Sequence, residues 1–134
     1  KKQYSFFKIN PITYLKELNG ELLDDPSVDI KGMDVIDLIQ NAEPRTYDAI
    51  LLDVDNGPVA MVDANNDQLY SNSGIRLMCR ALKKGGRIVV WSAGPDLKFE
   101  KRLGEFCCKF QRVAAKAYNG AKRARHMLYT LDPS

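Results

Sequence analysis

Hydrophobic and polar residues follow one another along the chain in short blocks that predict a series of strands and helices. Residues 47–52 contain the apolar triplet Ile50, Leu51 and Leu52. Consecutive apolar positions are typical of a strand that is buried on both faces of a parallel sheet. Residues 4–9, 28–30 and 87–92 carry the β-branched and aromatic residues of further strands. We therefore expect residues 47–52 to form the central strand of an α/β domain.

Between these strands, apolar residues recur at helical spacing after polar residues that can cap a helix. The expected first residues of the helices are Asn10 with Pro11, Asp34, Ser71 or Ser73, and Asp96. Gly85 and Gly86 are expected to end the third helix. The chain closes with two predicted strands near residues 110–118 and 127–131, joined by a turn at Asn119 and Gly120, and these are expected to pair antiparallel.

The chain has 134 residues, the length of a single domain, which we expect to span residues 1–134. No apolar run reaches the roughly 18 to 20 residues that a membrane span needs. The first residues also lack the apolar core of a signal peptide. We therefore expect a cytoplasmic protein that does not associate with a membrane.

The cysteines and the histidine do not form a metal-binding pattern. Cys79, Cys107 and Cys108 are the three cysteines, and none has the spacing of a metal ligand with the single histidine, His126. We expect reduced, buried thiols and no metal.

Charge is spread unevenly, although the formal net charge is only +3. Bases outnumber acids between residues 98 and 125, and a basic flank of this kind can attract a polyanion. The basic cluster at residues 122–125 contains no aromatic residue that would stack on a base. We therefore expect a solvated helix face and a basic loop rather than a nucleic-acid site.

Polar residues directly follow the apolar run at residues 47–52. Asp53, Asp55 and Asn56 precede a turn at Gly57 and Pro58. In open parallel sheets, ligands bind in the crevice beyond the carboxyl ends of the strands. The two carboxylates and the amide are therefore the first candidates for a binding site.

Short motifs along nearly the whole chain resemble, in the same order, successive landmarks of the spermidine synthase family. They are residues 8–11, 18–20, 23–28, 33–35, 47–58, 69–70, 84–86 and 90–93. The most specific is the acidic strand end Asp53-Val54-Asp55-Asn56-Gly57-Pro58. The family has the class I S-adenosylmethionine-dependent methyltransferase fold. The resemblance thus implies a Rossmann-like α/β fold with a mostly parallel sheet, helices on both faces and an antiparallel C-terminal strand.

In active members of this family, decarboxylated S-adenosylmethionine donates an aminopropyl group to putrescine. Such an acceptor amine is protonated near neutral pH, because alkyl amines have pKa values of about 10. Only the neutral amine can attack the carbon next to the sulfonium. A site for this reaction therefore needs a carboxylate that holds the cationic amine and helps to take its proton.

The resemblance implies a role for several residues. Asp53 matches the first aspartate of the family's Asp-x-x-Asp motif, which orients the amine, and its charge also assists binding of the cationic donor. The second aspartate has no direct counterpart, because this sequence is one residue shorter. Asp55 is the nearest carboxylate, and Asn56 stands nearer the aligned position. Asp34 matches the acidic position near the adenine end of the nucleoside, and Tyr70 would line the amine channel.

Three of these roles have a structural alternative. Asp34 is equally suited to cap a helix. The carboxylate of Asp53 can instead be held by the backbone of the turn that follows it. Tyr70 fits the hydrophobic core as well as a channel wall. The sequence does not decide between these alternatives.

The chain departs from the family at its beginning. The family's first β-α unit, with its glycine-rich turn, has no match before Lys8, so we expect an N-terminally truncated fold. Lys8 also replaces the acidic residue that binds the ribose hydroxyls, and an ammonium group cannot accept those hydrogen bonds. Either the sequence is a fragment of a longer protein, or it is a degenerate member of the family.

The missing strand would leave a gap in the sheet that dimerisation or strand exchange could fill, so we expect a homo-oligomer.

The leading interpretation is a spermidine synthase-like transferase domain. Its substrates would be a small cationic amine and either decarboxylated S-adenosylmethionine or S-adenosylmethionine. One alternative is a non-catalytic binding or assembly module that uses the basic C-terminal face, and another is a methyltransferase that acts on a different substrate.

Overall fold

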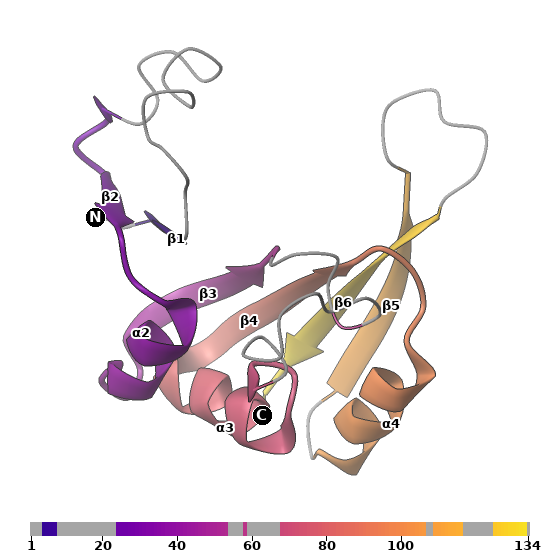
Figure 1. The fold of residues 1–134 in the computed structure, drawn as a ribbon. Helices are drawn as coiled ribbons and strands as arrows, with labels where there is room; N and C mark the ends of the chain where they lie inside the picture. The colour runs from indigo at the N-terminus through magenta and orange to yellow at the C-terminus, as the bar shows by residue number, and fades with distance from the viewer. Residues whose placement is uncertain are drawn as a thin grey trace. The chain divides into compact units, whose positions relative to one another are not determined.

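A computed structural model of the chain describes residues 4–7, 24–53, 58, 68–106, 109–116 and 125–133 (Figure 1). The chain divides into two compact units, Lys1–Asn41 and Ala42–Ser134. The expectation of a single domain over residues 1–134 stays a prediction, and we describe each unit by itself.

The first unit contains a parallel pair of strands and a short helix. β1 (Tyr4–Phe7) pairs with β2 (Val28–Lys31), and Tyr4 lies opposite Val28. α2 (Val35–Asn41) follows β2, and Val35 and Ile39 are its buried residues. These strands and this helix are where the sequence predicts them, whereas the helix expected after Asn10 lies outside the described residues.

The second unit is built on one mixed sheet with the strand order β3-β4-β6-β5. Its strands are β3 (Tyr47–Leu52), β4 (Leu82–Ser92), β5 (Lys109–Ala115) and β6 (His126–Asp132). β3 and β4 are parallel, while β6 runs antiparallel to both β4 and β5. The predicted antiparallel pair at the C-terminal end is therefore confirmed, and the turn at Asn119 and Gly120 lies outside the described residues.

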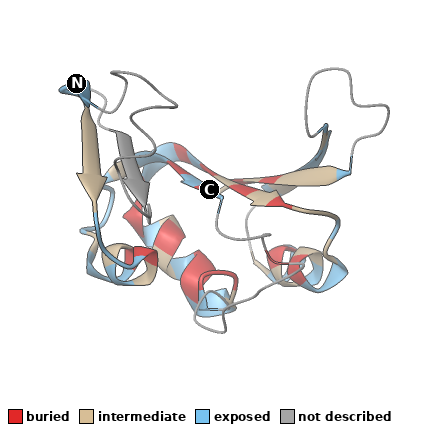
Figure 2. Ribbon diagram, turned by 45° about the horizontal axis from the view of Figure 1, so that its top comes forward, coloured by how far each residue is buried: buried red, intermediate tan, exposed pale blue. Residues whose placement is uncertain are grey.

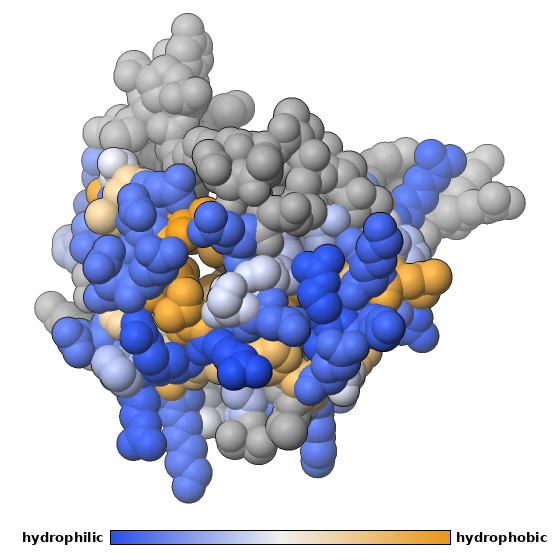
Figure 3. Space-filling model, turned by 60° about the horizontal axis from the view of Figure 1, so that its bottom comes forward, coloured by the Kyte–Doolittle hydropathy of each residue, from blue (hydrophilic) through white to orange (hydrophobic). Residues whose placement is uncertain are grey.

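Two helices cover one face of this sheet. α3 (Asn72–Ala81) lies between β3 and β4 in sequence, and α4 (Leu97–Glu105) follows β4. Figure 2 shows both helices on the same side of the sheet. Hydrophilic side chains dominate the surface seen in Figure 3, as expected where amphipathic helices face solvent.

The covered face forms the core of the second unit. Its strand residues are Ile50, Leu52, Ile88, Val90, Tyr129 and Leu131, and all of them are buried. Phe99 of α4 packs edge-to-face on two tyrosines, with its ring centroid 5.8 Å from that of Tyr70 and 5.3 Å from that of Tyr129. Aromatic pairs in this geometry stabilise a core beyond the area that they bury.

The expectation that residues 47–52 form a central strand buried on both faces is wrong for the sheet that the structure describes. β3 is an edge strand, and burial alternates along it. Ile50 and Leu52 point to the covered face, whereas Leu51 is 73% exposed. Three consecutive apolar residues predict a strand that is buried on both faces only if an element packs on each face. No described helix of this unit covers the face of the sheet that carries Leu51.

The third helix also ends earlier than predicted. α3 begins with Ser71 as its N-cap, where the hydroxyl accepts a hydrogen bond from the Gly74 amide, and it ends at Ala81. Gly85 and Gly86 lie inside β4 rather than after the helix. Gly85 has a positive φ of 78°, and a Cβ on Gly86 would lie 2.9 Å from the Asp48 carbonyl oxygen. Gly86 therefore permits the close approach of β4 to β3, near a register shift between Tyr47 and Ala49, and Gly85 supplies the left-handed backbone conformation.

Candidate active site

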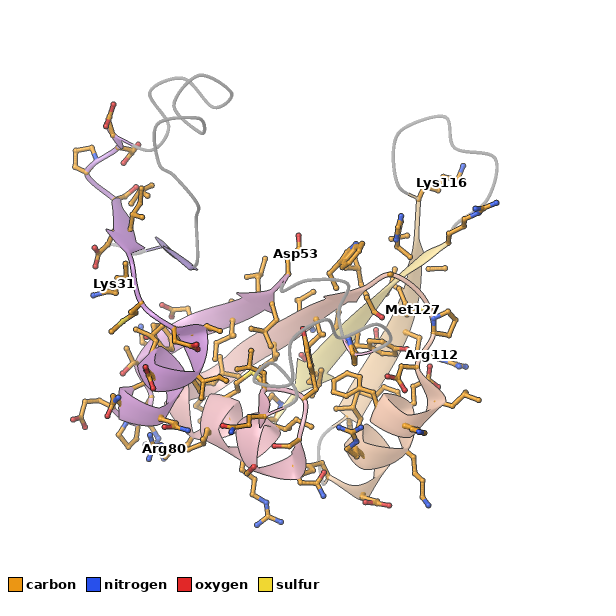
Figure 4. All side chains as sticks on the ribbon, in the orientation of Figure 1. Lys31, Asp53, Arg80, Arg112, Lys116 and Met127 are labelled. Atoms are coloured by element: carbon orange, nitrogen blue, oxygen red, sulfur yellow. The ribbon has the colours of Figure 1, made fainter. Side chains whose placement is uncertain are left out.

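The candidate site lies where the parallel strands β3 and β4 end. Asp53 directly follows β3 and is exposed, and Figure 4 shows its side chain pointing away from the strand end. Leu52 pairs with Val90, so Asp53 and Trp91, the next residue of each strand, both lie at this end of the sheet. An exposed carboxylate at the end of a strand can bind an alkylammonium group through its charge.

The same end of the sheet receives the first residues of β6, since this strand runs antiparallel to β4. His126 begins β6, and its ring stacks on that of Trp91 with a centroid distance of 5.0 Å and an angle of 31°. Its Nδ1 atom is buried and has no hydrogen-bond partner among the described residues. Arg125 directly precedes β6 and Lys116 directly follows β5, and both are exposed. Residues on four strands thus meet this end of the sheet, and the contact that joins two of them is the ring pair of Trp91 and His126.

Ser92 closes the end of β4. Its hydroxyl donates a hydrogen bond of 2.7 Å to the Gly94 carbonyl, and its side chain is completely buried. Asp96 then caps α4 by accepting hydrogen bonds from the amides of Lys98 and Phe99. The loop after β4 is thus held by its own hydrogen bonds, which gives the strand end a defined shape.

A hydrogen-bonded cluster beneath α4 was not predicted from the sequence. The Tyr129 hydroxyl accepts a hydrogen bond of 2.7 Å from the Asp96 amide and donates one of 3.0 Å to the Glu100 carboxylate. Arg112 of β5 donates to the other oxygen of Glu100 at 3.1 Å. Burial raises the pKa of Tyr129 to about 12, and the neighbouring Glu100 carboxylate acts in the same direction. The residue types at positions 126–132 could predict a strand. They could not identify the hydrogen-bond partners of the Tyr129 hydroxyl.

The remaining residues predicted for the site have the following positions. Asp34 is exposed, and its carboxylate accepts a hydrogen bond of 2.8 Å from the Ile36 amide, as a helix cap does. Tyr70 is completely buried, and its carbonyl accepts a hydrogen bond from Arg102. Asp55, Asn56 and Lys8 lie outside the described residues. The ligand-binding roles of all these residues stay predictions, and only Asp53 stands at the described end of the sheet.

The cysteine and metal expectations can be compared with the described part of the chain. Cys79 is half-buried rather than fully buried, whereas Cys107 and Cys108 are outside that part. Within it, no group of three or more histidine, cysteine or acidic side chains is placed to hold a metal ion. Among the described helices, none is long and apolar enough to cross a membrane.

Comparison with known proteins shows which class of fold this is. No family model matches the chain, and no curated protein matches it. Solved structures do match. They include a spermidine synthase in complex with the transition-state analogue AdoDATO, with a TM-score of 0.68 and 16% identity, over 98% of this chain and 46% of that one. A probable spermidine synthase from Corynebacterium glutamicum gives a TM-score of 0.67 and 19% identity, over 97% and 47%.

Human methyltransferase-like protein 13, in complex with SAH, matches with a TM-score of 0.65 and 15% identity, over 98% of this chain and 61% of that one. The chain therefore has an α/β, Rossmann-like methyltransferase fold, which it shares both with spermidine synthases and with a human methyltransferase-like protein. It spans less than half the length of the two spermidine synthases.

Proposed function

We propose that this chain forms the catalytic part of a transferase that uses decarboxylated S-adenosylmethionine, or S-adenosylmethionine itself, and that its acceptor is a small cationic amine. The observation that carries the proposal is the exposed carboxylate of Asp53 at the end of a parallel strand. It stands in a fold that is shared with a spermidine synthase solved with a transition-state analogue.

The chemistry that we assign to Asp53 follows from the charge of the acceptor. An alkylammonium group must lose a proton before its nitrogen can attack the carbon next to the sulfonium. A carboxylate positions the ammonium, stabilises its charge and accepts that proton. The Trp91 ring, at the same end of the sheet, would add an aromatic surface for the cation or its methylene chain.

We propose a role for each of the other predicted residues by itself. Asp55 would act with Asp53 in catalysis and, together with Asn56, would bind the amine substrate, and Tyr70 would contribute to the amine channel. Asp34 would bind the nucleoside through a carboxylate that already caps α2. The protein is proposed to act in the cytoplasm without a metal, and polyamine biosynthesis is the process that such a reaction would serve.

Calorimetric titration tests this proposal. We expect saturable binding of decarboxylated S-adenosylmethionine, S-adenosylmethionine or methylthioadenosine, and transfer of an aminopropyl group to putrescine in a turnover assay. Asp53→Asn should lower kcat/KM by about 10² to 10⁴, the usual effect of losing a general base. Asp48→Asn is the matched control, because Asp48 lies near the opposite end of the same strand and pairs with Lys83.

The outcomes separate the possible functions. Methyl transfer from S-adenosylmethionine without aminopropyl transfer would identify a methyltransferase instead. Absence of nucleoside binding in a folded protein would contradict both transferase functions and favour a non-catalytic binding module. Equal losses in the two variants would show that Asp53 has no special part in the reaction.

A further inference from the structure

A short loop connects the carboxyl end of β4 to α4, at the end of the sheet that carries Asp53. It comprises residues 93–96 and ends with Asp96, the N-cap of α4. Figure 1 shows the chain leaving the end of β4 along this loop toward α4. β3 and β4 are parallel, and the connections that follow adjacent parallel strands border the crevice in which such sheets bind ligands. The loop is therefore placed to border the candidate site.

The hydroxyl of Tyr129, a residue of β6, binds this loop. It accepts a hydrogen bond of 2.7 Å from the Asp96 amide, which lies 33 residues earlier in the sequence. The Tyr129 side chain is completely buried, and its ring packs edge-to-face on that of Phe99 with a centroid distance of 5.3 Å. The hydroxyl also donates a hydrogen bond of 3.0 Å to Glu100. Because both the ring and the hydroxyl are held, they fix the position of the Asp96 amide.

The start of α4 does not depend on this hydrogen bond. The Asp96 carboxylate accepts hydrogen bonds from the amides of Lys98 and Phe99, and the Asp96 carbonyl accepts one of 2.9 Å from the Glu100 amide. These local contacts cap the helix by themselves. They do not fix the loop relative to the sheet, because their donors lie on α4. The contact with Tyr129 is different, since it ties the loop to β6.

The other end of the loop is held as well. Ser92, the last residue of β4, donates a hydrogen bond of 2.7 Å to the Gly94 carbonyl, and its side chain is completely buried. A Cβ on Gly94 would lie 3.9 Å from the Arg125 carbonyl oxygen, so the loop also passes close to the residue before β6. A loop that is fixed at both ends offers a preformed surface, which binds a ligand at a lower entropic cost.

We propose that Tyr129 is a positioning residue of the candidate active site, and that the loop fixed by its hydroxyl borders the acceptor amine. The inference rests on the proposed function, in which Asp53 binds this amine at the end of the neighbouring strand. Tyr129 does not contact the substrate in this arrangement and acts through the Asp96 amide. Without the hydroxyl, this half-buried amide lacks its partner, and the loop shifts to hydrate it.

Steady-state kinetics of Tyr129→Phe test the proposal, at a temperature at which every variant is folded. We expect KM for the amine to rise about tenfold while kcat changes by less than about twofold, because a wall of the amine site moves and Asp53 stays in place. The dissociation constant of the nucleoside, measured by calorimetry, should change by less than about twofold. A purely structural role would lower the midpoint of unfolding and would not separate these three values.

Arg112→Gln is the matched control. Arg112 donates a hydrogen bond of 3.1 Å to Glu100 in the same cluster, but the bond between Tyr129 and Asp96 does not involve it. This variant should therefore keep KM for the amine. Ser92→Ala is a second test of the loop, since it removes the hydrogen bond to the Gly94 carbonyl and should also raise KM for the amine. It keeps the proposal testable if Tyr129→Phe does not fold.

The possible outcomes are distinguishable. An unmodified protein that binds no nucleoside and transfers no group would refute the proposed function itself, and the role of Tyr129 with it. An active protein in which folded Tyr129→Phe, or in its absence Ser92→Ala, leaves KM unchanged would overturn only the positioning role. An equal rise of KM in Arg112→Gln would do the same, because the effect would then follow from loss of the cluster in general. A change in nucleoside affinity instead of KM would overturn the assignment of the loop to the amine.

Discussion

The two faces of the four-stranded sheet are built from the same strands and yet differ in almost every respect. Leu52 and Leu51 are neighbours in the chain, but Leu52 is 3% exposed beneath the helices and Leu51 is 73% exposed on the opposite face. On the covered face, Tyr129 and Phe99 pack between β6 and α4. On the uncovered face, Val113 is 46% exposed and Trp91 is half-buried. The comparison teaches that burial in a sheet is decided for each face separately, by the element that packs on it.

The polar contacts of the two faces also differ in how far they are exposed to solvent. The covered face holds the hydroxyl of Tyr129 between the Asp96 amide and Glu100, away from water. Arg87 and Asp132, on adjacent strands, form an ion pair with two contacts of 2.6 and 2.9 Å, and more than two fifths of each side chain is exposed. Hydrogen bonds that are shielded from water contribute more than exposed ion pairs, so the two faces should respond differently to substitution.

The adjacent leucines give the largest expected contrast. Leu52→Ala should lower the free energy of unfolding by about 2–5 kcal/mol, because it leaves a cavity in the core. Leu51→Ala should change it by no more than about 0.5 kcal/mol, as expected for an exposed position. Urea unfolding of both variants measures the two values. Similar losses in the two variants would show that the second face of β3 is covered.

The Tyr129 cluster gives an intermediate effect. Tyr129→Phe keeps the ring but leaves the Asp96 amide and Glu100 without this partner, so we expect a loss of about 1–3 kcal/mol at neutral pH. Tyr47→Phe is the matched control, since Tyr47 is half-buried at the start of β3. Chemical unfolding of both variants measures the difference, and equal losses would contradict a special contribution of the cluster.

The pKa of Tyr129 adds a pH signature to this prediction. The phenol has a pKa of about 12 in the folded chain, against its ordinary value of 10.0. Its contribution is complete below pH 10 and is lost as the pH rises toward 12, because the unfolded chain releases the proton first. Tyr129→Phe should show a smaller decline over this range than the unmodified chain. An identical decline would mean that the phenol is not buried.

The exposed ion pair gives the smallest effect. Asp132→Asn removes the partner of Arg87, and pairs that reach solvent contribute little to stability. The hydrogen bond from Arg87 lowers the pKa of Asp132. Its contribution is therefore present above the ordinary carboxylate pKa and is lost as the pH falls through the lowered value. Thermal unfolding from neutral to acidic pH should show slightly less acid sensitivity in the variant, and Arg87→Gln should reproduce that result.

The sequence predicted the elements of the second unit well, because these depend on local patterns. Ser71 and Asp96 cap α3 and α4 as expected from their side-chain oxygens. The sequence also predicted that β3 ends in acidic residues. Among the predicted site residues that the structure describes, Asp53 lies at the carboxyl end of this strand. The glycines of β4 misled the prediction, since a glycine pair fits a helix end and a close strand approach equally well in sequence.

The chain by itself determined which segments become strands and helices, where most helices begin, and which strand ends in carboxylates. Those properties follow from side-chain spacing and from hydrogen bonds over a few residues. Only the tertiary structure decided that β3 lies at the edge of its sheet and that its second face is not covered by a described helix. It also brought Tyr129, Glu100 and Arg112 together from three separate elements. The physical reason is that pairing order and burial depend on contacts between distant segments, which a local pattern cannot specify.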